Sequence, residues 1–222
     1  TATGNTWYSS SWPYRKKIVV NRKKIAGDSQ LSGFPLLISR TDNDLKGSAS
    51  GGFVQRVTGN DVLFTDIAGA KLSHEIESYT PTTGNLVAWV KASPSPNFDQ
   101  TMYMYYGASG QASQQNATAV WDSNFNGVWH LKEDPSAGIC GGGIDACDST
   151  SNDKDMVAQG GMGASNSVAG KIGSAFSFTR ASTQYLDLGH AVFVELVPSV
   201  GRSVIIFVRA RVKMQHGDVF GV

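Results

Sequence analysis

Short apolar runs separated by turn residues fill roughly the first hundred positions of the chain. The run at 100–108 places Met102 and Met104 on one expected face and Tyr103 and Tyr105 on the other. No amphipathic stripe of helical period extends beyond two turns, so the pattern predicts strands and an all-β fold. The expected strands are YRKKIVVN (14–21), FPLLISR (34–40), DVLFTD (61–66), NLVAWVKA (85–92) and QTMYMYYGA (100–108).

The pattern changes at residues 107–119, which are small and polar and predict a linker or a short surface helix. Strand-like segments resume with NGVWHL, SAFSFT and QYLDLG, and VRARVKM near the end alternates like a half-exposed strand. Between them, residues 133–170 form a long stretch rich in glycine, serine and asparagine with few expected core positions. Such a loop usually binds something or wraps the sheet. We therefore expect two domains, at residues 1–112 and 118–222.

The charge balance argues against nucleic acid or an anionic membrane as the main partner. The 222 residues carry 19 Lys and Arg against 18 Asp and Glu, and phosphate binding needs a basic field. No apolar run approaches the roughly 20 residues that span a bilayer. Abundant glycine and small polar residues suit an extracellular β protein. A start at Thr1 fits a processed secreted chain or a trimmed one, so we expect a secreted or cell-surface protein.

The two cysteines lie close together in CGGGIDAC. Three glycines among the six intervening residues let the backbone bend, so a small disulfide between Cys140 and Cys147 is expected, with two free thiols as the alternative. A metal site would need more thiol or imidazole ligands than stand nearby.

The first part of the chain resembles an uncharacterised extracellular prokaryotic family, domain of unknown function 2341. The resemblance rests on WPYRKKI, DVLFTD, LSHEIES, VAWVK and MYYG, which occur in this order. The resemblance implies an extracellular location and no particular activity.

The second part resembles the beginning of a laminin-G-like, or concanavalin A-like, lectin/glucanase jelly roll. This resemblance rests on the segments GVWHLKED, DSTSNDKD and GKIGSAFSFTRASTQYLDLG. The resemblance implies two β-sandwich (jelly-roll-like) units, the second a partial one, and a role in adhesion or sugar binding. Half a sandwich leaves open edges and an apolar face, so we expect it to pack against the first domain or to form a homo-oligomer.

Five aromatic residues are candidates for stacking on sugar rings, whose apolar C–H faces suit aromatic planes. Burial in the core is the competing interpretation for each of them. The N-terminal cluster is the better platform, because termini and edges are exposed. The candidates are Trp7, Tyr8, Trp12, Trp121 and Trp129.

Two carboxylates offer an alternative, catalytic chemistry. Glu75 and Glu77 are two residues apart on an expected strand, a spacing compatible with the acid and nucleophile of a glycoside hydrolase. A second acidic group stands at Glu133 and Asp134. We expect Glu75 and Glu77 to lie on a solvated strand face, with catalysis as the alternative.

An acidic loop is a candidate calcium site, because Ca²⁺ takes hard oxygen ligands. An ordinary polar loop stabilised by Asx-turns is the alternative. The residues are Asp145, Asp148, Asn152, Asp153 and Asp155.

The leading hypothesis from the sequence is therefore non-catalytic recognition of a polysaccharide or cell-surface glycan. A glucanase-type glycoside hydrolase and a structural subunit of a surface layer or filament remain as alternatives.

Overall fold

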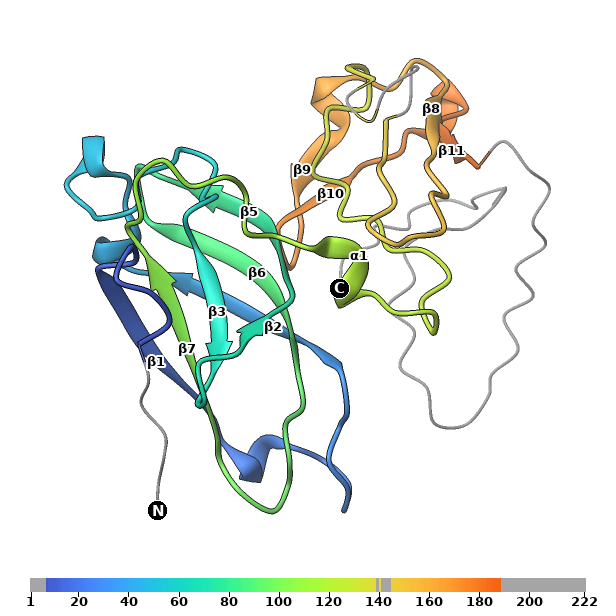
Figure 1. The fold of residues 1–222 in the computed structure, drawn as a ribbon. Coiled ribbons are helices and arrows are strands. Elements are labelled where there is room, and N and C mark those ends of the chain that lie inside the picture. Colours follow the sequence, from blue (N-terminus) through green and yellow to red (C-terminus); the bar gives the residue numbers. More distant parts are fainter. Residues whose placement is uncertain (1–6, 139, 141–144, 189–222) are drawn as a thin grey trace. The chain divides into compact units, whose positions relative to one another are not determined.

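The computed structural model describes residues 7–138, 140 and 145–188, and the chain divides into two compact units. Unit 1 comprises Thr1–Val120 and unit 2 comprises Trp121–Val222. Antiparallel strands are the main regular structure of both (Figure 1), which confirms the all-β prediction. The strand expected at VRARVKM lies outside the described residues.

Helical structure is limited to single turns in the part of the chain that the structure describes. No helix there is long and apolar enough to cross a membrane. The α-helix is α1 (Ala117–Val120), and the 3-10 helices are η1 (Arg22–Lys24), η2 (Asn43–Leu45), η3 (Ser48–Ser50), η4 (Ala164–Asn166) and η5 (Arg180–Ser182).

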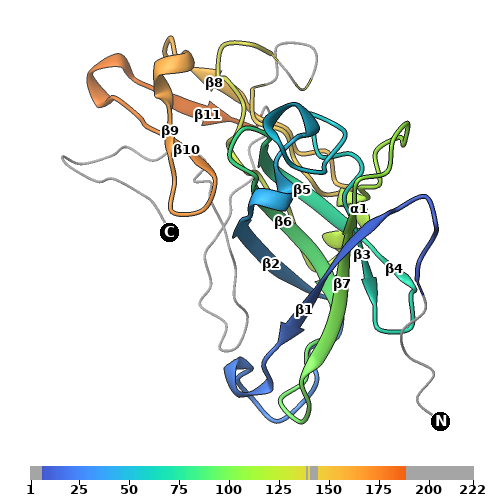
Figure 2. The same ribbon diagram turned by 90° about the vertical axis from the view of Figure 1, so that its left-hand side faces the viewer.

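Unit 1 consists of two antiparallel sheets, here called sheet A and sheet B (Figures 1 and 2). The strands predicted from the alternation of apolar residues are all present. Sheet A has the order β1 (Tyr14–Val20), β7 (Gln100–Tyr106), β3 (Leu63–Asp66) and β4 (Lys71–Leu72). Sheet B has the order β2 (Phe34–Thr41), β6 (Asn85–Ala92) and β5 (His74–Thr80).

The main core of unit 1 forms from alternate residues of both sheets. On β6, Leu86, Ala88 and Val90 are fully buried in this core, and from sheet A it receives Phe64 and Met104. Because side chains alternate across a strand, every second residue of each sheet points into this core. Burial of each large side chain contributes roughly 1.5–3 kcal/mol.

The outer face of sheet A carries a second, aromatic cluster. Tyr105 points away from the main core, as its alternation with Met104 predicts, and packs with Leu63, Trp12 and Ala108. Both faces of β7 are therefore buried. Tyr8 and Trp12, which precede β1, cover the outer face of β7 at Tyr105.

A β-bulge interrupts the pairing of β5 with β6. Ile76 pairs with Ala88 and Ser78 pairs with Val87, so Glu77 is an extra residue on β5. A bulge leaves its extra residue out of the ladder and bends the strand locally.

One side of the sandwich is open between the edge strands β1 and β2. A groove of about 430 Å³ lies there, with Ile18, Ile38 and Met104 among its apolar lining. Lys16 of β1 forms ion pairs of 2.8 Å with Asp42 and with Asp44, both just after β2. The ion pairs connect the two sheets at this opening.

The segment before α1 is fixed to the edge of β5. The backbone N–H of Asn116 donates to the carbonyl of His74 over 2.9 Å, and Ile76 N–H donates to Oε1 of Gln115 over 2.6 Å. These bonds cover the edge of sheet B that β6 leaves unpaired. The predicted linker is thus a strap on unit 1 that ends in one helical turn.

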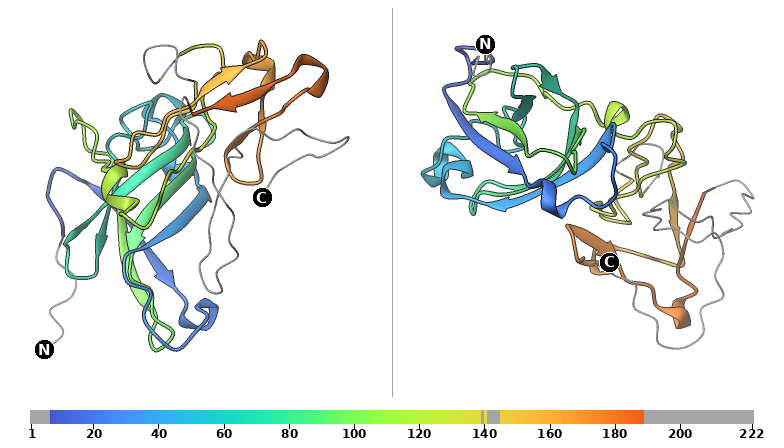
Figure 3. Two further views of the ribbon diagram at one scale, coloured as in Figure 1. Left: turned by 90° about the vertical axis from the view of Figure 1, so that its right-hand side faces the viewer. Right: turned by 90° about the horizontal axis from the view of Figure 1, so that it is seen from below.

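Unit 2 contains two short antiparallel ladders, coloured orange in Figure 3. NGVWHL, expected as a strand, contributes one isolated bridge between Trp129 and Asp148. Residues 133–170, expected to hold few core positions, do supply Ala146 and Met156, which pair through their backbones and are fully buried. The ladders are β8 (Val157–Gln159) with β11 (Tyr185–Asp187), and β9 (Ser167–Ala169) with β10 (Ser174–Phe176).

Candidate functional site

The aromatic cluster on sheet A is anchored by hydrogen bonds. The indole N–H of Trp12 donates to the carbonyl of Asp61 over 3.0 Å, and Trp12 is buried. The hydroxyl of the buried Tyr105 accepts two bonds of 3.1 Å, from the backbone N–H of Tyr8 and from Nη1 of Arg15. The segment before β1 is therefore held at Trp12 and at Tyr8.

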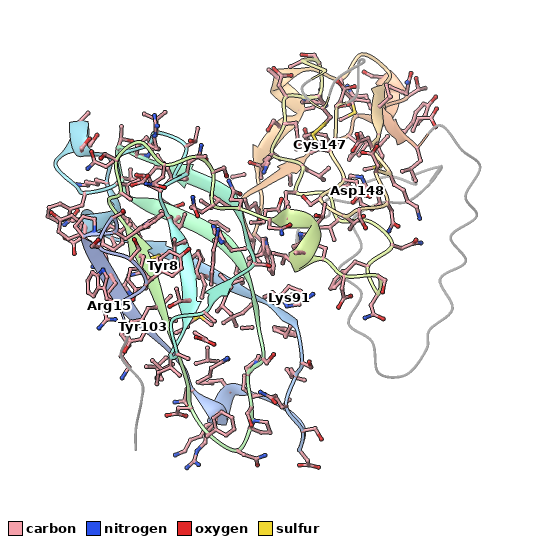
Figure 4. The ribbon with its side chains drawn as sticks, viewed as in Figure 1. Tyr8, Arg15, Lys91, Tyr103, Cys147 and Asp148 are labelled. Carbon is pink, nitrogen blue, oxygen red and sulfur yellow. A yellow bond between two sulfur atoms is a disulfide. The ribbon has the colours of Figure 1, made fainter. Side chains whose placement is uncertain are left out.

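Trp7 lies on top of this anchored layer and is 42% exposed. Its indole N–H donates to the carbonyl of Trp12 over 2.9 Å, and its ring meets the ring of Tyr105 edge-on at 5.4 Å. Arg15 places its guanidinium carbon 4.6 Å from the Trp7 ring centroid and 4.4 Å from that of Tyr103. Figure 4 shows Tyr8, Arg15 and Tyr103 grouped on this side of unit 1. We call Trp7, Tyr8, Arg15, Tyr103 and Tyr105 the Trp7 platform.

Strand register explains why these residues meet. Arg15 is paired with Tyr105, and Lys17 with Tyr103, so the outward residues of β1 and β7 form one row. A guanidinium over an aromatic ring contributes about 0.5–1 kcal/mol at an exposed site. Arg15, close to the rings of Trp7 and Tyr103, therefore favours the observed orientation of Trp7.

A second, smaller aromatic group lies at the start of β1. The rings of Tyr14 and Phe53 stack with their centroids 4.3 Å apart, and both residues are more than one-third exposed. Tyr14 also stacks on Tyr106 at 5.7 Å. Gly107, with φ of +91°, lies under the Tyr14 ring, where a Cβ would come within 2.6 Å of it.

The structure thus brings Trp7, Tyr8 and Trp12 together but places the other two candidate rings in unit 2. Trp121 is buried and its ring meets that of Phe125 edge-on at 5.1 Å. Trp129 is half-buried, packs against the core of unit 2 and donates its indole N–H to the carbonyl of Lys154 over 2.8 Å.

The expected solvated strand face at Glu75 and Glu77 is wrong, because each residue is only 5% exposed. Glu77 is the bulge residue, and its Oε2 accepts a 2.7 Å bond from the indole N–H of Trp89. On the same face, Lys91 donates from Nζ to the carbonyl of Ala119 in α1 over 2.9 Å. The bulge and the α1 turn belong to a packed layer of unit 1.

His74, next to this pair, is fully buried and faces the main core. Its ring meets that of Phe64 edge-on at 5.2 Å. Burial lowers the pKa of His74 to about 4, so the imidazole is neutral at physiological pH.

Asp148 organises the acidic loop of unit 2 through its carboxylate. Oδ1 accepts from the backbone N–H groups of Val128 and Thr150, each over 2.9 Å. Oδ2 accepts from the Thr150 hydroxyl over 2.8 Å and from the Lys154 N–H over 2.9 Å. A cation at this carboxylate would compete with four donors.

Of the other proposed calcium ligands, Asp145 and Asn152 also form hydrogen bonds with neighbouring residues, and Asp153 is exposed. Asp145 is buried and accepts from the backbone N–H groups of Gly138 and Ala158. Asn152 donates to the carbonyls of Phe125 and Asn126, while Asp153 is exposed with φ of +54°. Calcium binding stays a prediction for this loop.

The predicted disulfide between Cys140 and Cys147 is present in unit 2. Glu133 lies beside it and is only 5% exposed. Burial raises the pKa of Glu133 above its ordinary value, because desolvation disfavours the charged carboxylate. The neighbouring Asp134 accepts from the backbone N–H and the hydroxyl of Ser136.

Sequence reasoning missed Arg15, Tyr103 and Tyr105 as site residues. The signal was partly visible, since the alternation at 100–108 places both tyrosines on one face. It did not reveal that β1 pairs with β7 and so brings Arg15 next to them.

Comparison with known proteins supports the first of the two resemblances. The sequence model of a domain of unknown function (DUF2341) matches residues 58–134, a range that includes the strands from β3 to β7. No curated protein and no solved structure matches the chain. Residues 58–134 are thus similar to that family, while the jelly-roll resemblance of the second part stays a prediction.

Proposed function

We propose that the protein is a non-catalytic carbohydrate-binding protein that uses the Trp7 platform to recognise a polysaccharide or cell-surface glycan outside the cell. The observation that carries the proposal is an exposed tryptophan whose orientation is fixed by its bond to Trp12 and by the Arg15 guanidinium.

Preorganisation makes this surface suitable for a weak, flat ligand. A ring that is already oriented loses little conformational freedom on binding, so more of the stacking energy appears as affinity. The apolar face of a pyranose suits the Trp7 indole, and the Arg15 guanidinium supplies hydrogen-bond donors at its rim. The disulfide of unit 2 is compatible with an extracellular location.

The alternative hydrolase finds less support in unit 1. A glycoside hydrolase needs two carboxyl groups across an open groove that admits the sugar. Glu75 and Glu77 are buried, and Glu77 accepts a bond from Trp89. The burial of these two carboxylates therefore favours sugar binding over glycoside hydrolysis as the function of unit 1.

The test is a binding assay of the purified chain against insoluble and soluble glucans, xylan and chitin, with reducing ends measured in the same samples. We expect binding without new reducing ends. Trp7→Ala should weaken binding about tenfold, because a lost aromatic stack of about 1.4 kcal/mol corresponds to that factor.

Phe98→Ala is the matched control, since Phe98 is a 55% exposed aromatic residue of unit 1 outside the platform. It should bind as the wild type does. Equal binding by Trp7→Ala and the wild type would refute the platform, and release of reducing ends that Glu77→Gln abolishes would make the protein an enzyme.

A further inference from the structure

The disulfide of unit 2 and a buried carboxyl group form a compact cluster. The two sulfurs of Cys140 and Cys147 and a carboxylate oxygen of Glu133 all lie within 4.8 Å of one another. Among the described residues, this is the one group of three side chains with metal-ligating atoms so close together.

Glu133, which belongs to this cluster, has an unsatisfied side-chain oxygen. Its Oε2 is buried and has no hydrogen-bond partner, although Glu133 as a whole is only 5% exposed. Burial of a polar oxygen without a partner is unfavourable, so a cation bound at Glu133 would give this oxygen the partner that it lacks. Cys140 and Cys147 are half-buried residues.

We propose that reduction of the Cys140–Cys147 disulfide turns this cluster into a binding site for a thiophilic divalent cation of the Zn²⁺ type. The ligands are the two cysteine thiolates and the Glu133 carboxylate, a third protein ligand that the spacing of the cysteines alone does not reveal. In the oxidised protein, the sulfurs are bonded to each other and the site cannot form. The proposal is independent of the carbohydrate site in unit 1.

The chemistry balances with a small dithiol as the reductant. The dithiol supplies two electrons and two protons, its own sulfurs join in a disulfide, and the Cys140–Cys147 bond breaks to give two thiols. Binding of the cation then releases the two thiol protons to solvent, because thiolates are the ligands. A water molecule completes four-coordinate geometry.

The residues on either side of Cys147 are held in the fold independently of the disulfide. Cys147 lies between Ala146, which pairs with Met156 in the core, and Asp148, whose carboxylate accepts four bonds. In a tetrahedral zinc site with Zn–S bonds of about 2.3 Å, the sulfurs lie about 3.8 Å apart. Once the bond is broken, the two sulfurs would have to move apart from bonding distance to this separation to hold the ion.

The test is titration of the reduced full chain with Co²⁺ and Zn²⁺ in the absence of oxygen. Co²⁺ should produce a thiolate-to-metal charge-transfer band that Zn²⁺ abolishes, and a pH indicator should record proton release. The oxidised chain should give neither signal. Circular dichroism of the reduced chain serves as the control and should show that its β structure is retained.

Variants identify the ligands. Cys147→Ser should abolish the charge-transfer band, and Glu133→Gln should weaken Zn²⁺ binding by at least about tenfold, since even loss of an outer-shell partner costs roughly ten- to a hundredfold. Asp134→Asn, which changes the adjacent carboxylate, should bind like the wild type.

Three results would overturn the proposal. They are no Co²⁺ band in the reduced wild type, equal affinity of Glu133→Gln and the wild type, and loss of β structure on reduction that Zn²⁺ does not restore.

Discussion

The indole N–H of Trp89 donates to Oε2 of Glu77 over 2.7 Å, and the bulge in β5 brings the two residues together. Both residues are buried. Glu77→Ala leaves a buried indole donor without this acceptor, so we expect the free energy of unfolding to fall by about 2–3 kcal/mol. Glu77→Gln keeps a side-chain oxygen and should cost less than about half of that. Urea denaturation followed by tryptophan fluorescence measures both, and equal losses in the two variants would argue against the bond.

His74 should make unit 1 sensitive to mild acid. Burial lowers its pKa from about 6.5 to about 4, so the unfolded chain takes up a proton in this range that the folded chain does not. The stabilisation is complete above pH 6.5 and is lost as the pH falls towards 4, by about 3 kcal/mol in total.

Urea denaturation across this pH range checks the prediction by comparing the wild type with His74→Leu. The leucine variant should show a shallower decline with falling pH, because it has no imidazole to protonate. Parallel curves for the two proteins would assign the acid sensitivity to other groups.

Gly127 leaves room for the Trp129 indole in unit 2. A Cβ at this position would lie 2.2 Å from Cη2 of Trp129, closer than atoms can approach. Gly127→Ala should therefore displace the indole from the carbonyl of Lys154 and lower the free energy of unfolding by about 1–3 kcal/mol. Gly163→Ala is the control, because its nearest neighbour would be 4.0 Å away. Thermal unfolding and tryptophan fluorescence measure both, and equal stability would contradict the contact.

Asp148 should be the most sensitive position of the acidic loop. Asp148→Ala removes the acceptor of four bonds, three of them from backbone N–H groups, and should cost about 3 kcal/mol or more. Asp153→Asn should change stability by less than about 0.5 kcal/mol, since the residue is exposed and asparagine tolerates its positive φ. Melting temperatures distinguish the two variants. The same measurement with Ca²⁺ and with EDTA checks the calcium prediction.

Alternation along the chain predicts the strands of unit 1 well because each of them commits alternate residues to a buried layer. Met104 and Tyr105 illustrate this, since each is buried on its own face of β7. The burial of Glu77 could not be predicted in this way. A bulge shifts the register of β5 by one residue, and no pattern in the sequence indicates that bulge.

The candidate site was predictable in part. Trp7 and Tyr8 stand out in the sequence as neighbouring aromatic residues, but Arg15 is brought to them through Tyr105, which lies 90 residues further along the chain. In unit 2, Ala146 and Met156 form core contacts from a glycine-rich stretch without alternation, since isolated bridges do not impose a period of two.

The ion pairs of Lys16 affect the tendency of unit 1 to aggregate at high concentration. It stands on an edge strand whose backbone groups would otherwise offer a template to a strand from another molecule. Its ammonium group points into the opening between β1 and β2 and is held there by Asp42 and Asp44. A foreign strand that closed the opening would have to bury these charges, which is costly. The ion pairs that connect the two sheets thus also protect the protein from edge-to-edge aggregation.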